Sequence, residues 1–143
     1  MSWRDKLNQF EGKVGFRPGV MEEALKQAEA ALGEKLPDDL RELYLESDGL
    51  YSKEERLDLI WPLAELPKQN RVFRSNEDFR ELYMSFDQLL FISLDGGGNQ
   101  YAYRMLPDPS DGQIYEWDHE NDNRTWRASF LEDYCRRRLT GKW

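Results

Sequence analysis

The residues best suited to chemistry lie between positions 116 and 122, where the only histidine of the chain stands among acids. A zinc site needs about three protein ligands, most often His or Cys, and His119 has no second histidine to join it. A calcium loop has Gly at its sixth position and Glu at its twelfth, whereas a loop starting at Asp118 has Asn123 and Ser129 there. The pattern therefore favours a solvated turn after a strand over a metal or acid–base site.

A glycine-rich segment at 95–99, Asp-Gly-Gly-Gly-Asn, is a candidate for holding phosphate. It lacks the Lys and the Ser or Thr of a Walker loop and the spaced glycines of a dinucleotide-binding fingerprint. It also leads into a predicted strand, so no helix N-terminus would face a phosphate group. Because Gly and Asn tolerate positive φ, the segment predicts a tight hairpin turn instead.

The single cysteine, Cys135, excludes an internal disulfide and a cysteine-based zinc cluster. With His119 it would offer the residue types of a nucleophile–base pair. Its spacing, however, places it on the apolar stripe of a helix with Leu131, Tyr134 and Leu139. We therefore expect a buried, inert thiol. No spacing singles out a catalytic pair among the 28 carboxylates, so the sequence predicts a protein that is not an enzyme. The alternative is an enzyme whose carboxylate site the spacing does not show.

One surface feature suggests binding. The segment from 108 to 122 holds six acids and no Lys or Arg: Asp108, Asp111, Glu116, Asp118, Glu120 and Asp122. Tyr115 and Trp117 stand among them and would point to opposite faces of a strand. Acids around an aromatic ring are typical of a surface that binds a basic partner. An ordinary sheet with a polar outer face accounts for the pattern equally well.

Length and charge narrow the class of protein further. The chain has 143 residues, the size of one domain, and a net charge of −8. Nucleic-acid backbones and anionic membranes repel such a chain unless it carries a local basic patch. The charged N-terminus is unlike a signal peptide, and no apolar run approaches the ~18 residues of a membrane span. We expect one cytoplasmic domain over 1–143, with no cofactor, no metal, and no direct nucleic-acid or membrane partner.

The elements that position these residues follow from periodicity and turn signals. Helices are predicted over 3–11, 20–32, 37–48, 76–83 and 131–139. Strands are predicted over 57–61, 89–94, 100–105, 114–117 and 124–128. Helices and strands are segregated along the chain, which favours an α+β fold over a doubly wound one. We predict a largely antiparallel mixed sheet flanked by N-terminal helices and a C-terminal helix.

The segment from Glu29 to Gly49 resembles the N-terminal signature of the SUKH superfamily, the SMI/KNR-type domain. That signature runs Glu, then Leu-Gly, then Leu-Pro, then a helix closed by Asn-Gly or Asp-Gly. Further along, the chain is similar to the family at 61–63, at 89–103, at 114–117 and at 129–134. Together these pieces cover roughly 20–140. Many members carry Gly-Asp where this chain has Gly98-Asn99, which leaves the role of an acid there in doubt.

The resemblance implies a non-enzymatic α+β domain. Bacterial members resemble immunity proteins that neutralise a cognate toxin, often a nuclease, and eukaryotic relatives act as regulatory scaffolds. We expect an immunity protein with a basic toxin as partner; a scaffold without a toxin partner is the alternative. The expected docking residues are Trp61, Asp95, Asn99, Tyr101, Glu116, Trp117, Asp118 and His119. The sequence does not say which sheet face the helices cover, and hence which of these residues are core.

Overall fold

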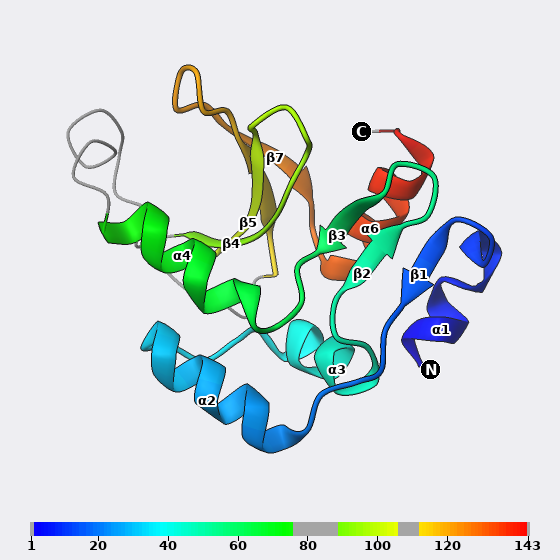
Figure 1. The fold of residues 1–143 in the computed structure, drawn as a ribbon. Helices are drawn as coiled ribbons and strands as arrows, with labels where there is room; N and C mark the ends of the chain where they lie inside the picture. The colour runs from blue at the N-terminus through cyan, green and yellow to red at the C-terminus, as the bar shows by residue number, and fades with distance from the viewer. Residues whose placement is uncertain (1, 76–88, 106–111, 143) are drawn as a thin grey trace.

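The computed structural model describes residues 2–75, 89–105 and 112–142 (Figure 1). Its helices are α1 (Trp3–Lys6), the 3-10 helix η1 (Asn8–Phe10), α2 (Glu22–Leu32), α3 (Asp38–Glu46), α4 (Glu65–Ser75) and α6 (Leu131–Thr140). Its strands are β1 (Val14–Phe16), β2 (Leu50–Ser52), β3 (Leu57–Ile60), β4 (Leu89–Leu94), β5 (Gln100–Arg104), β6 (Ile114–Trp117) and β7 (Arg124–Ala128). Within these residues, no helix combines the length and the apolar character of a bilayer span.

The strands form two antiparallel sheets, one of order β1-β2-β3 and one of order β4-β5-β6-β7. The expected α+β class with antiparallel strands and flanking helices is confirmed, but the strands are divided between two sheets. The division follows β3, where the backbone N–H of Trp61 donates to the carbonyl oxygen of Ile92 in β4 at 2.9 Å. Pro62 comes next and has no N–H with which to continue the pairing.

Helix α4 covers one face of the four-stranded sheet. Its Phe73 ring lies 4.6 Å from the Phe91 ring and 5.9 Å from the Trp117 ring, measured between centroids. Its Asn70 is fully buried, and the side-chain amide exchanges two hydrogen bonds with the backbone of Phe91, each 2.8–2.9 Å long. Asn70 also donates to the Leu66 carbonyl oxygen, so this buried amide is satisfied by backbone groups.

Helix α6 covers the opposite face and also reaches the three-stranded sheet (Figure 1). Tyr101 and Ala102 point to opposite faces of β5, and the Tyr101 ring packs 5.3 Å from the ring of Tyr134 in α6. The Tyr134 hydroxyl donates to the Leu59 carbonyl oxygen of β3 at 2.6 Å. The predicted burial of Cys135 in this helix is confirmed.

The predicted elements compare closely with the observed ones. Helices α2, α3 and α6 and strands β3 to β7 match the predicted segments. The predicted helix over 3–11 is divided at Leu7 into α1 and η1. Strands β1 and β2 and helix α4 were not predicted, and the predicted helix over 76–83 lies outside the described residues.

Candidate functional site

The eight docking residues expected from the sequence fall into two groups. Trp61, Tyr101 and Trp117 are 6%, 5% and 2% exposed and belong to the hydrophobic core. The buried Trp117 ring keeps its polar atom satisfied, since Nε1 donates to Asp122 Oδ1 at 2.8 Å. In this structure the three rings therefore do not form exposed aromatic anchors among the acids.

The five polar residues of the set gather where two hairpins end. We call Asp95, Asn99, Glu116, Asp118 and His119 the hairpin cluster. Asp95 and Asn99 belong to the turn between β4 and β5, whereas Asp118 and His119 follow β6. The two turns lie at the same end of the four-stranded sheet because β5 and β6 pair antiparallel, with Gln100 opposite Trp117.

Asn99 joins the two hairpins through its side-chain amide. Its Nδ2 donates to Glu116 Oε2 at 3.0 Å, and its Oδ1 lies 2.9 Å from Nδ1 of His119. A carboxylate only accepts hydrogen bonds, so the contact with Glu116 fixes the orientation of the amide. The Asn99 oxygen then faces the imidazole and accepts, which places the proton on Nδ1 of His119.

The predicted hairpin turn over 95–99 is confirmed. Asp95 Oδ1 accepts hydrogen bonds from the backbone N–H groups of Gly97 at 2.7 Å and Asn99 at 3.2 Å, which is the arrangement of an Asx turn. Gly98 has φ 101°, and a Cβ atom there would lie 2.8 Å from Cε1 of His119. Glycine is therefore favoured by the backbone at position 98, and a larger residue there would displace the imidazole ring that rests on it.

The acids of β6 and of the turn that follows it also stabilise the β6–β7 hairpin. Glu116 pairs with Arg127 on β7, with 2.9 Å between Oε1 and Nε. Asp118 Oδ1 accepts from the backbone N–H of Glu120 at 2.9 Å. The carboxylate of Glu120 is exposed and makes no hydrogen bond or ion pair within the described residues. Glu120 is therefore the acid of this turn that is most available to a partner. Asp108 and Asp111 of the acidic segment lie outside those residues.

Burial alters the ionisation of one side chain of α6 and one of β5. Cys135 is fully buried, and burial raises the pKa of its thiol well above the ordinary value, so the thiol stays protonated. Burial likewise raises the pKa of the Tyr101 hydroxyl. Among the described residues, no group of three or more His, Cys, Asp or Glu side chains is arranged to hold a metal ion.

A concave site, which the sequence did not indicate, lies on the three-stranded sheet. It is lined by Arg17, Tyr51, Ser52, Lys53, Arg56, Leu57 and Asp58. These residues come from the end of β1 and from the β2–β3 hairpin. Arg17 is more than thirty positions away from the hairpin in the sequence, so no local spacing could reveal the site.

Comparison with known proteins places the chain in a family. The model of the SMI1 / KNR4 family (SUKH-1) matches residues 19–137, which include α2 and most of α6. No curated protein matches the chain. The match spans most of the 143 residues and confirms the resemblance that the leucine, proline and glycine signals carried. The chain belongs to the SMI1 / KNR4 family (SUKH-1).

Proposed function

We propose that the protein is a cytoplasmic immunity protein that neutralises a cognate toxin by binding it. Membership of the SUKH-1 family supports a binding role of this kind. The observation that carries the proposal is the hairpin cluster, where acids and an imidazole are held in place by hydrogen bonds between two turns. Such a preordered group loses little freedom on binding, which favours affinity.

Charge indicates a basic partner. The chain has a net charge of −8, and the turn after β6 adds Asp118, Glu120 and Asp122 to the carboxylate of Glu116. An acidic surface steers a cationic protein toward it and raises the association rate. A toxin that acts on nucleic acid has a basic substrate-binding surface, and an acidic inhibitor would compete with the substrate there.

An immunity gene should lie beside the gene of its toxin. The experiment therefore uses the protein and the product of the neighbouring gene. Stopped-flow binding at low and high salt measures the association rate and its salt dependence. Glu120→Lys should slow association several-fold and weaken the salt dependence, because the Glu120 side chain is exposed and makes no hydrogen bond or ion pair within the part of the chain that the structure describes.

Glu23→Lys on α2 is the matched control, since it makes the same charge change at an exposed site on another face. The control has the same net charge as Glu120→Lys and should leave the salt dependence close to that of the wild type. Equal effects of the two variants would place the toxin-binding surface elsewhere. The proposed function would be overturned if the product of the neighbouring gene did not bind the protein. It would also be overturned if the protein did not protect cells that express that product.

A further inference from the structure

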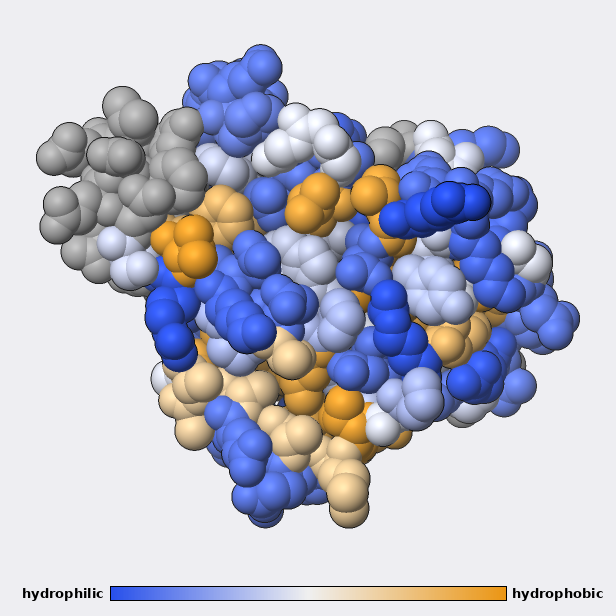
Figure 2. All heavy atoms as spheres, viewed as in Figure 1, coloured by the Kyte–Doolittle hydropathy of each residue, from blue (hydrophilic) through white to orange (hydrophobic). Residues whose placement is uncertain are grey.

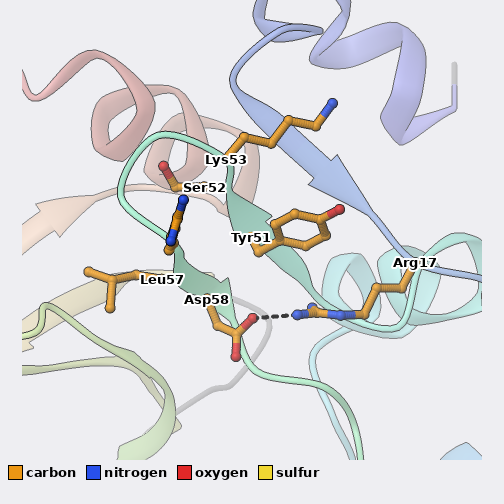
Figure 3. Close-up of a pocket in the computed structure, with 7 residues that line it drawn as sticks. Arg17, Tyr51, Ser52, Lys53, Leu57 and Asp58 are labelled. Carbon is orange, nitrogen blue, oxygen red and sulfur yellow. Dashed lines mark hydrogen bonds and ion pairs between the residues drawn. The ribbon is translucent and has the colours of Figure 1, made fainter.

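The outer face of the three-stranded sheet carries a pocket of about 440 Å³ (Figure 3). Three of its seven lining residues are cationic, namely Arg17, Lys53 and Arg56, and one is anionic, namely Asp58. The pocket is thus locally basic on a chain whose net charge is −8. Figure 2 shows hydrophilic side chains gathered over β2 and β3, on the right of that view. The local reversal of charge calls for a separate explanation.

The floor of the pocket is rigidly built around Tyr51. This residue pairs with Gly15 on β1 and with Asp58 on β3, so all three lie on the outer face. A Cβ atom at Gly15 would collide with the ring of Tyr51, which shows that the ring lies directly across the glycine. The absence of a side chain at position 15 therefore fixes the place of the ring.

Arg17 is oriented by two contacts with this floor. Its guanidinium lies 4.7 Å from the centroid of the Tyr51 ring, and its Nη2 donates to Asp58 Oδ1 at 2.8 Å. Figure 3 shows the Arg17 and Asp58 side chains pointing toward each other below the Tyr51 ring. A guanidinium held on two sides is preorganised to bind a further planar anion.

Arg56 occupies a strained position in the β2–β3 turn. Its φ is 57°, in the left-handed region that favours glycine, and its backbone N–H donates to the Ser52 carbonyl oxygen at 2.9 Å. Its guanidinium makes no hydrogen bond or ion pair with any residue that the structure describes. The backbone hydrogen bond to Ser52 closes the turn, but the side chain makes no such contact within the described residues, and strain of this kind is concentrated at functional positions.

The other walls set the shape of a suitable ligand. Lys53 extends away from the Arg17–Asp58 pair, and its Nζ lies 3.5 Å from the carbonyl oxygen of Glu11, so it belongs to the rim (Figure 3). Leu57 supplies an apolar wall and approaches the β4–β5 turn, since a Cβ at Gly96 would lie 3.3 Å from its Cδ1. The pocket therefore offers two guanidinium groups beside an aromatic ring and an aliphatic side chain.

We propose that this pocket binds an acidic segment of a partner protein, with a carboxylate between Arg17 and Arg56 and an apolar side chain against Tyr51 and Leu57. The guanidinium fork matches a carboxylate in geometry, and the local charge is complementary to it. Nucleic acid fits less well, because the strand would continue past this small basic site across an acidic protein. The proposal does not depend on the hairpin cluster, which has the opposite charge and lies on the other sheet.

The test is a fluorescence anisotropy titration of the whole protein. The probes are fluorescein-labelled octapeptides that each contain three glutamates and one phenylalanine, with the phenylalanine placed at each position in turn. The control peptides have glutamine in place of glutamate. The variants are Arg17→Ala and Arg56→Gly. Lys26→Ala, which removes an exposed cation on α2, is the matched control. A thymidine dodecanucleotide and inorganic phosphate serve as competitors.

At least one glutamate peptide should bind saturably, whereas its glutamine counterpart should not. Arg56→Gly should weaken binding about tenfold, the factor expected for one charge-assisted hydrogen bond, and Lys26→Ala should leave it unchanged. Because glycine suits the left-handed turn position, the Arg56→Gly variant folds even if Arg17→Ala does not. Absence of saturable peptide binding, equal binding by Arg56→Gly, or stronger competition by the oligonucleotide or by phosphate than by unlabelled peptide would overturn the proposal.

Discussion

The guanidinium of Arg138 lies 4.7 Å from the centroid of the Tyr101 ring, at the boundary between the two sheets. Its Nη1 donates to Ser93 Oγ at 2.8 Å and to the Tyr134 hydroxyl at 3.1 Å. The same guanidinium donates to the carbonyl oxygens of Asp58 in β3 and Leu94 in β4, at 3.4 and 3.3 Å. One side chain of α6 thereby satisfies polar groups of both sheets at the place where their pairing ends.

Arg138→Ala should lower the free energy of unfolding by about 2–4 kcal/mol, because it removes a cation–π contact and the hydrogen bonds that the guanidinium donates to buried acceptors. Arg137→Ala is the control on the same helix, because it also removes a cation–π contact, with the exposed Trp126 ring, and an ion pair with the partly exposed Asp133 one helical turn away. That change should cost less than about 1 kcal/mol. Urea unfolding of both variants measures the difference. Equal losses would show that Arg138 does not hold the two sheets together.

Gly98→Ala should destabilise the protein by more than about 1 kcal/mol, because it introduces a Cβ at positive φ and against the His119 ring. Gly97→Ala is the matched control in the same turn. Gly97 is not among the glycines with positive φ, and a Cβ there would lie 3.4 Å from Asp95 Oδ1, an ordinary contact. Thermal unfolding should separate the two variants; similar melting temperatures would contradict the role assigned to Gly98.

The parts of the fold that the sequence predicted are those with a local signal. Helix α2 shows an apolar stripe, and the β4–β5 hairpin has a glycine-rich turn between two apolar runs. Strands β1 and β2 have three residues each, too few for a periodic pattern. Helix α4 contains Pro67 near its start and the buried amide Asn70, and both obscure its apolar stripe. Its formation depends on contacts with β4 that are distant in the sequence.

The candidate site was predicted in part for the same reason. The polar residues at 95–99 and 116–119 are brought together by two adjacent hairpin ends, which turn signals locate well. The positions of Trp117 and Tyr101 were not predictable, because α4 covers one face of the four-stranded sheet and α6 the other. When both faces are buried, alternation along a strand no longer distinguishes core from surface.

The stability of the protein should depend on pH through Asp39. Burial raises the pKa of this carboxyl, although Oδ1 accepts from the Tyr103 hydroxyl at 2.9 Å. The folded state therefore holds the proton more tightly than the unfolded chain, so ionisation of Asp39 opposes folding. The penalty is absent below the ordinary carboxyl pKa and is complete above the raised one.

Asp39→Asn removes this titration and keeps an oxygen that can accept from Tyr103. The unfolding free energy of the variant, relative to that of the wild type, should rise as the pH increases from the ordinary carboxyl pKa to the raised pKa of Asp39. Asp38→Asn, at an exposed position in the same helical turn, controls for the loss of an acid near the helix N-terminus. A difference that falls as the pH rises would contradict the assignment.

The left-handed backbone of Arg56 should lower the stability of the protein. Arg56→Gly should raise the unfolding free energy by about 1 kcal/mol and the melting temperature by about 3 °C, because glycine adopts φ 57° without steric cost. Arg56→Ala removes the same guanidinium but keeps a Cβ in the left-handed region, so it should change stability little. Calorimetry of the three proteins makes the comparison. If alanine stabilised as much as glycine, charge rather than backbone strain would be responsible. If glycine did not stabilise, Arg56 would be making a contact that supports the fold, and its left-handed backbone would no longer indicate a role in ligand binding.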